Sequence, residues 1–147
     1  MAERALILLG WCEWVALPEL GITAIRAKID TGARSSSLHV DAQESFQQAG
    51  REWVRFRLHL DGAEAREPVE CRAPVHDRRA VRDSGGHVTE RVFILNRVAL
   101  AGQDYPIELN LAARRGLKFP LLLGRTALAD RFLVDAAHRG LLGGEPL

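Results

Sequence analysis

The sequence has little of what a secreted or membrane-bound protein needs. Its 147 residues include only two cysteines, Cys12 and Cys71, which are too few for the disulfide framework of a small secreted domain. The apolar run at residues 5–9 is shorter than a signal-peptide core, and no stretch approaches the roughly 18 apolar residues of a membrane span. We therefore expect a reduced, cytoplasmic protein that does not associate with a membrane.

An excess of charge of either sign is also lacking. Lys and Arg number 20 and Asp and Glu number 19, for a formal net charge of +1. This balance gives no support to a nucleic-acid partner. The arginines are unevenly placed, however, because Arg78, Arg79 and Arg82 fall close together. Two interpretations of this cluster remain open, a solvated face and a surface for an anionic ligand.

Motifs for metals and nucleotides are missing as well. The sequence contains neither a His-Glu-x-x-His segment nor a Gly-x-x-x-x-Gly-Lys loop. Its five histidines are scattered singly, and Cys71 and His76 have no second pair at the spacing of a zinc site. We expect no metal site and no cofactor in this chain.

What the sequence does have is a period of two between apolar and polar residues, the pattern of β-strands. In residues 53–60, Val54, Phe56 and Leu58 fall on one face, and Asp61-Gly62 follows as a hairpin-turn signal. Residues 101–104 predict another turn. Further strands are predicted at residues 25–29 and 105–111, and residues 88–100 predict one long strand or a strand pair. Residues 121–124 are apolar throughout, as in a strand buried on both faces.

Only two segments have helical signals. Residues 126–132 begin with a Thr cap and would make about two turns, and residues 44–49 would form a shorter turn before Gly50. Many short strands separated by turns are typical of a sandwich or barrel. We predict a single all-β domain spanning residues 1–147, with one short helix near the C-terminus.

The most specific chemical feature is Asp30-Thr31-Gly32, at the end of the predicted strand 25–29. A carboxylate held in a rigid turn can share a proton with a partner carboxylate and activate a water molecule. Thr31 can donate a hydrogen bond that fixes the turn, and Gly32 lets the backbone approach closely. On its own, the triplet is a weak signal that favours an ordinary structural turn.

The surroundings of the triplet favour the catalytic interpretation. Six segments carry this context: residues 13–21, 27–39, 77–79, 83–87, 122–128 and 132–135. Together they resemble the retropepsin-like aspartic peptidase family associated with ATP-grasp ligases, often labelled "ATP-dependent zinc protease". The resemblance covers nearly the whole chain.

The resemblance implies a small closed retropepsin-like β-barrel, with Asp30, Thr31 and Gly32 as its catalytic loop. In that fold, residues 122–124 would run beside this loop, and a glycine-bearing hairpin would cover the cleft. Adjacent glycines suit a mobile hairpin tip over a site that must open. At this tip, in contact with the substrate, we place Asp83, Ser84, Gly85 and Gly86.

Asp83-Ser84-Gly85 also has the form of a second catalytic triplet. A two-lobed aspartic peptidase needs two barrels, for which 147 residues are too few. Residues 80–82 also lack the apolar strand that precedes Asp30. We therefore expect Asp83 to be a turn residue.

One catalytic aspartate per chain implies a homodimer in which the two copies of Asp30 share one proton. Ala33 and Arg34 follow the triplet, and we expect both to contact the substrate. Retroviral enzymes typically have an acidic residue where this chain has Arg34. The positive charge would hinder a shared-proton pair, would recognise a carboxylate on the substrate, or would simply belong to an exposed loop.

Two functions remain open. The first is an aspartic-type peptidase acting on a restricted or acidic protein tail. The second is a catalytically weak or inactive peptide-binding module of the same fold, working with an ATP-grasp peptide ligase. The partners expected are therefore a protein or peptide substrate, a second copy of the chain and the pathway of such a ligase.

Overall fold

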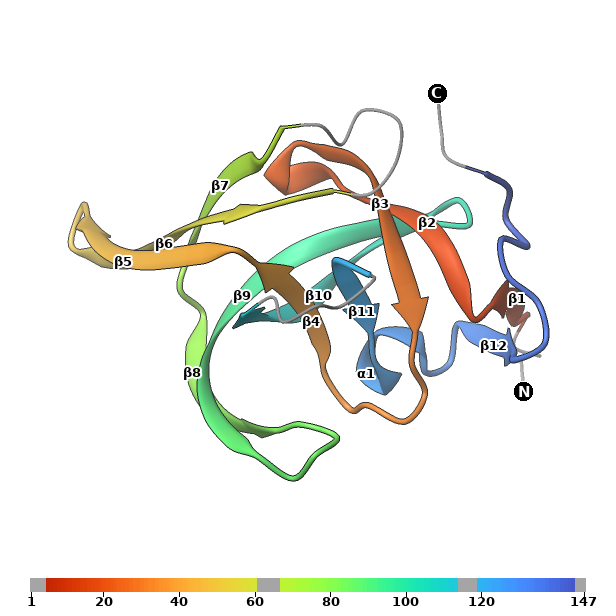
Figure 1. Ribbon diagram of the computed structural model, residues 1–147. Coiled ribbons are helices and arrows are strands. Elements are labelled where there is room, and N and C mark those ends of the chain that lie inside the picture. Colours follow the sequence, from red (N-terminus) through yellow and green to blue (C-terminus); the bar gives the residue numbers. More distant parts are fainter. Residues whose placement is uncertain (1–4, 61–66, 114–118, 145–147) are drawn as a thin grey trace.

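The computed structural model describes residues 5–60, 67–113 and 119–144 (Figure 1). In chain order the elements are β1 (Ile7–Gly10), β2 (Cys12–Leu17), the 3₁₀ turn η1 (Pro18–Leu20), β3 (Ile22–Ile29), β4 (Ser36–Val40), β5 (Ala42–Gln48), β6 (Arg51–Leu58), β7 (Val69–Pro74), β8 (Asp77–Arg82), β9 (Val88–Leu100), β10 (Gln103–Ala113), β11 (Leu121–Leu123), α1 (Arg125–Leu128) and β12 (Phe132–Asp135). The prediction of an all-β fold with one short helix near the C-terminus is confirmed.

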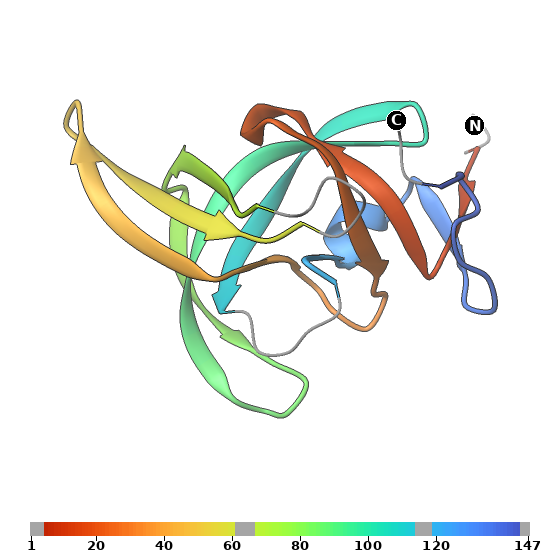
Figure 2. The same cartoon turned by 45° about the horizontal axis from the view of Figure 1, so that its top comes forward.

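Six of the strands form a circuit of pairings (Figures 1 and 2). The largest sheet has the order β10-β4-β11-β3-β2-β9-β8, and β9 pairs with β10 as well, so the pairing returns to its start. Between β2 and β9 the circuit is joined at a single residue pair, Ala16 with Ala99. Strands β5, β6 and β7 form a separate three-stranded sheet, and β1 pairs with β12.

The alternation of apolar and polar residues determines which side chains fill the core. In β3, Ile25, Ala27 and Ile29 are buried, while Lys28 between them is exposed. The same pattern occurs in β6, where the side chain of Phe56 is 1% exposed. Burial of these apolar faces is the main favourable term that holds the strands together.

The structure corrects the helical turn predicted for residues 44–49, which belong to β5. This strand pairs antiparallel with β6 along its whole length, and Phe46 stacks on Trp53 with ring centroids 6.4 Å apart. Glu and Gln favour helices as isolated residues, but the neighbouring strand supplies hydrogen bonds and a stacking partner that outweigh this weak preference. Ala49 and Gly50, both at positive φ, form the connecting turn.

The helix α1 is shorter than the two turns predicted for residues 126–132. It begins after Gly124 and ends at Leu128, and Ala129 already has an extended ψ of 137°. Asp130 then adopts a φ of +68°, and Phe132 begins β12, which pairs in parallel with β1. The buried Phe132 is fixed by this strand pairing, which the local helix signal does not contain.

The long apolar pattern at residues 88–100 proves to be one continuous strand, β9. The turn predicted at residues 101–104 is present, with Ala101 at φ +53° and Gly102 at φ +73°, and it connects β9 to β10. The Asp61-Gly62 turn signal lies outside the described residues.

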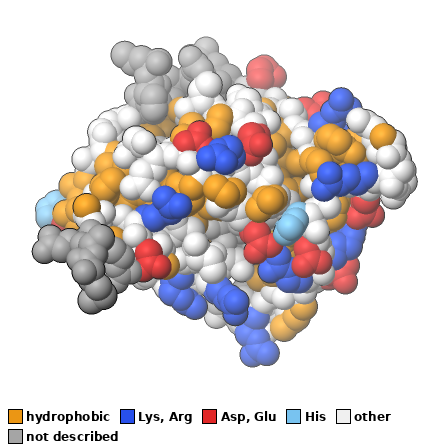
Figure 3. All heavy atoms as spheres, turned by 180° about the vertical axis from the view of Figure 1, so that it is seen from behind, with side chains coloured by type: hydrophobic (Ala, Val, Ile, Leu, Met, Phe, Trp, Pro, Cys, Tyr) orange, Lys and Arg blue, Asp and Glu red, His pale blue; other side chains and the backbone are white. Residues whose placement is uncertain are grey.

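Charge is mixed on the surface. On the face seen in Figure 3, side chains of Lys and Arg are interspersed with those of Asp and Glu. Within the described ranges, no helix combines the length and the apolar character needed to cross a membrane.

Candidate active site

Asp30 lies directly after the last residue of β3, where a short strand fixes its backbone. Strand β11 inserts between β3 and β4, parallel to the first and antiparallel to the second. The N–H of Asp30 continues the ladder by donating to the carbonyl of Leu123 over 2.9 Å. The expected position of residues 122–124 beside the Asp30 loop is thereby confirmed.

The turn that follows holds the carboxylate of Asp30. Oδ1 accepts a hydrogen bond of 2.9 Å from the N–H of Gly32, and the carbonyl of Asp30 accepts a bond of 3.3 Å from the N–H of Ala33. A Cβ at Gly32 would lie 3.2 Å from Oδ1, tighter than most such contacts. Asp30 itself is half-buried, so its carboxylate is both fixed and accessible.

Thr31 takes part through its backbone, where the sequence suggested its hydroxyl. Thr31 is exposed, and its carbonyl accepts a 2.9 Å hydrogen bond from Nη1 of Arg125 in α1. Gly32 is exposed beside it. The Asp-Thr-Gly turn thus presents one face to solvent and rests its other side on α1.

The segment after the turn is clamped by the start of α1. The carbonyl of Ala33 accepts a 2.8 Å bond from the N–H of Arg125, and that of Arg34 accepts bonds from both the N–H and the hydroxyl of Thr126, at 3.1 and 3.0 Å. Gly124 makes this approach feasible. A Cβ at Gly124 would overlap the carbonyl of Ser35 and lie 2.9 Å from that of Ala33.

The two predicted substrate contacts after the triplet differ in exposure. Ala33 is half-buried, whereas Arg34 is exposed. Within the described part of the chain, the side chain of Arg34 has neither an ion pair nor a hydrogen bond, although its carbonyl is part of the clamp. Its positive charge is therefore exposed to solvent, four residues after Asp30 in the sequence.

Residues 83–86 do form a hairpin tip, between β8 and β9. The backbone of Asp83 exchanges hydrogen bonds with His87 and Gly86, and its Oδ1 accepts from the N–H groups of Gly85 and His87, both at 2.9 Å. These last two bonds, that from His87 first, hold the pKa of the Asp83 carboxyl below its usual range. Ser84 and the rest of the tip are exposed.

Asp83 is thus a turn residue, as expected, because its carboxylate is engaged with its own loop. Gly86, at φ +84°, closes the turn. In both ribbon views, the β8–β9 hairpin extends from the circuit of six strands on the same side as the β3–β4 loop (Figures 1 and 2).

Several residues of the site were missed by sequence reasoning. Buried beneath the loop, the N–H of Gly124 donates to Oγ of Ser36 over 3.0 Å. The amide of Asn110 bonds to Ser36 and Ser37 from β10, with its Nδ2 donating to the Ser36 carbonyl and its Oδ1 accepting from the Ser37 hydroxyl. Arg125 and Thr126 could have been suspected from their place after the apolar strand, but no local signal pointed to Asn110.

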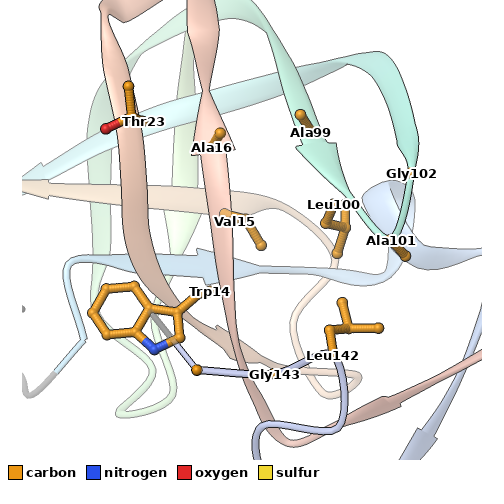
Figure 4. A pocket seen from close by; sticks show the side chains of 11 residues that line it. Trp14, Val15, Ala16, Thr23, Ala99, Leu100, Ala101, Gly102, Leu142 and Gly143 are labelled. Atoms are coloured by element: carbon orange, nitrogen blue, oxygen red, sulfur yellow. The ribbon is translucent and has the colours of Figure 1, made fainter. Parts of the chain in front are cut away.

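Two surface hollows among the described residues do not border the Asp30 loop. One, of about 350 Å³, is formed by β2, the β9–β10 turn and the C-terminal loop, with Trp14 and Leu142 on opposite sides (Figure 4). The loop is held by buried Glu13, whose carboxylate accepts from the N–H groups of Leu141 and Leu142. This hollow does not include the Asp30 loop. No group of three metal-ligating side chains is found in the ranges that the structure describes.

Comparison with known proteins agrees with this geometry. A family model described as "RimB-like: Retropepsin-like aspartic endopeptidase RimB" matches residues 8–142. A protein named probable alpha-L-glutamate ligase from Desulfotalea psychrophila is 40% identical over 136 residues, which are 92% of this chain and 29% of the relative. Its namesake from Shewanella halifaxensis is 36% identical over 136 residues, 92% of this chain and 30% of the relative. The chain therefore spans about three tenths of the length of these curated relatives.

Among solved structures, a Legionella pneumophila protein of unknown function has a similar fold. The two superpose with a TM-score of 0.77 at 24% sequence identity, covering 94% of this chain and 99% of that one. This likeness concerns the fold alone.

The clamp can be tested by Gly124→Ala. The new methyl group would displace the carbonyl of Ser35, so we expect the free energy of unfolding to fall by about 1–3 kcal/mol in urea denaturation. Gly144→Ala is the matched control, because a Cβ there meets nothing within 4 Å, and its effect should stay within about 0.5 kcal/mol. Equal stability of the two variants would contradict the proposed clamp.

Proposed function

This chain belongs to the RimB-like family of retropepsin-like aspartic endopeptidases, and on that premise we propose that it is an aspartic-type peptidase whose reaction depends on Asp30. The observation that supports this most is the Asp30 turn itself. One carboxylate oxygen is held by the N–H of Gly32, the adjoining backbone is clamped by α1, and the triplet remains open to solvent on one side.

The mechanism requires a second carboxylate, which a second copy of the chain would supply. Two Asp30 side chains facing each other cannot both ionise cheaply at such close range, so they would share one proton. The ionised member would take a proton from a water molecule as that water attacks the scissile carbonyl, while the protonated member donates to the carbonyl oxygen. The exposed positions of Thr31 and Gly32 fit a two-fold contact at this point.

The hairpin with Asp83, Ser84, Gly85 and Gly86 at its tip would cover the bound peptide. Its glycines and its wholly exposed tip suit a segment that opens and closes. Ala33 and Arg34, next to the catalytic turn, would contact the substrate backbone and side chains. Support for these roles comes from the sequence position of Ala33 and Arg34 after the triplet and from the hairpin lying on the side of the β3–β4 loop (Figures 1 and 2).

We propose an acidic peptide tail as the substrate. Two relatives that contain a region similar to this chain are named as glutamate ligases, and most of their length lies outside that region. A ligase that adds glutamate makes an acidic product, which a peptidase of the same pathway would trim. Two exposed cations flank Asp30 in the sequence, namely Lys28 in β3 and Arg34 after the turn.

The central test is Asp30→Asn, which keeps the size of the side chain and removes the acid. We expect cleavage of a glutamate-tailed peptide to fall by about 10³-fold or more, with thermal unfolding nearly unchanged. Asp104→Asn, in an exposed ion pair with Arg97 on the β9–β10 hairpin, is the control and should cleave normally. Undiminished cleavage by the Asp30 variant would refute the proposed mechanism.

The acidic substrate can be tested separately through the salt dependence of binding. Binding of a hexaglutamate peptide to the inactive Asp30→Asn chain should weaken by about tenfold or more between about 0.05 and 0.5 M NaCl, because salt screens exposed charges. A hexaglutamine peptide should show little dependence. Fluorescence anisotropy gives both dissociation constants, and equal salt dependence would argue against an acidic tail. Binding without any cleavage by the wild type would instead identify an inactive binding module.

A further inference from the structure

A line of side chains leads from the Asp30 loop to Arg91 in β9, across one face of the sheet formed by β3, β11, β4, β10 and β9. Residues paired in register project to the same side of a sheet, and so do residues two apart in a strand. The pairs that define the line are Lys28 with Leu122, Leu122 with Ser37, Ser37 with Asn110, and Asn110 with Phe93. Asp30 follows Lys28 by two positions at one end, and Arg91 precedes Phe93 by two at the other.

Hydrogen bonds to buried Asn110 and to exposed Thr89 hold Arg91 in place along this line. Its Nη1 donates over 3.0 Å to Oδ1 of Asn110, the same oxygen that accepts from the hydroxyl of Ser37 over 2.9 Å. Its Nε donates to the hydroxyl of Thr89 over 3.2 Å. Asn110 is fully buried and Ser37 is 8% exposed, so Arg91 has a rigid support while remaining only half-buried itself.

Arg91 forms no ion pair with a described carboxylate. Both of its hydrogen-bond acceptors are neutral oxygens, and no carboxylate among the described residues is within ion-pair distance. Its neighbour across the β8–β9 hairpin, Arg79, is by contrast paired with both Asp77 and Glu108. Three of the five N–H donors of Arg91 therefore have no acceptor in the described part of the chain.

The partial burial of the Arg91 guanidinium favours the binding of an anion beside it. It lowers the pKa of the Arg91 guanidinium, with the carboxylate of Asp83 at the hairpin tip opposing the shift. A partly desolvated cation without a counterion is unfavourable, and a carboxylate that entered the site would relieve this. The planar fork of an arginine matches a carboxylate with two parallel hydrogen bonds.

We propose that Arg91, held by Asn110, determines the specificity of the site by binding the carboxylate of a glutamate side chain in the peptide substrate. The inference rests on the proposed function and names the group that would recognise its acidic substrate. Arg91 lies on the second strand of the hairpin, four residues after His87. A peptide that reached from Asp30 to Arg91 would thus lie between the catalytic turn and the base of the hairpin, passing Lys28 and Leu122.

The test measures binding in the inactive Asp30→Asn background, so its result does not depend on whether the wild type cleaves. The probes are fluorescent hexaglutamate and hexaglutamine peptides, and the quantity compared is the ratio of their dissociation constants. Adding Arg91→Gln should reduce the preference for glutamate by about 10- to 100-fold, the loss of one charge-assisted bidentate pair.

Arg57→Gln is the matched control. Arg57 is an exposed arginine of β6 with no ion pair in the described ranges, and its replacement makes the same change in net charge. The preference for glutamate should survive in this variant. A preference that falls equally in both variants would mean that only the net charge matters and would overturn the proposal.

A second variant separates recognition from folding. Asn110→Asp keeps the size of the side chain and places a carboxylate against Nη1 of Arg91, so the cation acquires a permanent internal partner. The bond that Nδ2 donates to the carbonyl of Ser36 is lost in this variant, which is why its thermal unfolding is measured. The preference for glutamate should fall in this variant too, while thermal unfolding confirms a folded chain. If the preference is unchanged in folded Asn110→Asp and in Arg91→Gln, Arg91 is not the specificity determinant.

Discussion

The close approach of Gly124 to the carbonyls of Ala33 and Ser35 is the constraint on which the candidate site depends. Because Gly124 has no side chain, β11 can insert between β3 and β4 and then turn directly into α1. The first N–H groups of α1 are thereby brought onto the loop that follows Asp30, which satisfies donors that a short helix would otherwise leave to water. A three-residue strand and a one-turn helix are stable here because each is the partner of the other and of the loop.

A rigid base and an exposed hairpin are combined in one chain. Around the turn of Asp30, hydrogen bonds from β11 and α1 fix the backbone, and the buried amide of Asn110 ties β4 to β10. The hairpin tip with Asp83, by contrast, is held only by hydrogen bonds that the described residues of its own loop make with each other. The backbone around Asp30 is therefore fixed by long-range contacts and its carboxylate by the neighbouring N–H of Gly32, while the hairpin that would cover the site depends on local contacts. This difference is expected of a site that must admit a peptide.

Much of the fold could be predicted from the sequence, because a period of two determines which faces of the strands are buried. The strand leading into Asp30 was predicted for this reason, whereas the hairpin tip at Asp83 was predicted from the family resemblance and from its two adjacent glycines. The segment 44–49 was predicted wrongly as helical, since its pairing with β6 has no counterpart in its own composition. The helix predicted at residues 126–132 was too long for the same reason. Residues from Phe132 onward pair with β1 as strand β12, and this pairing is not visible in the local sequence.

The site was predictable only in part, for a related reason. Asp30 and Gly32 belong to one short motif, so their geometry follows from neighbouring residues. Asn110, by contrast, bonds to Ser37, and Arg91 bonds to Asn110, only through the pairing of β9, β10 and β4. Asn110 lies 73 residues from Ser37 in the chain. Polar residues on strands are usually solvated, and only the register shows that Asn110 lies on the same face of the sheet as Ser37, with Arg91 two positions from Phe93, the partner of Asn110.

The pairing of two Asp30 side chains is the central claim, and subunit mixing tests it most directly. Wild-type chain is mixed with an equal amount of Asp30→Asn chain, allowed to exchange subunits, and assayed on a glutamate-tailed peptide at constant total protein. If the active unit needs both carboxylates, the rate should be about one quarter of that given by the same total of wild-type protein, because only that share of random pairs is intact. A rate of about one half would show that each chain acts alone and would contradict the account.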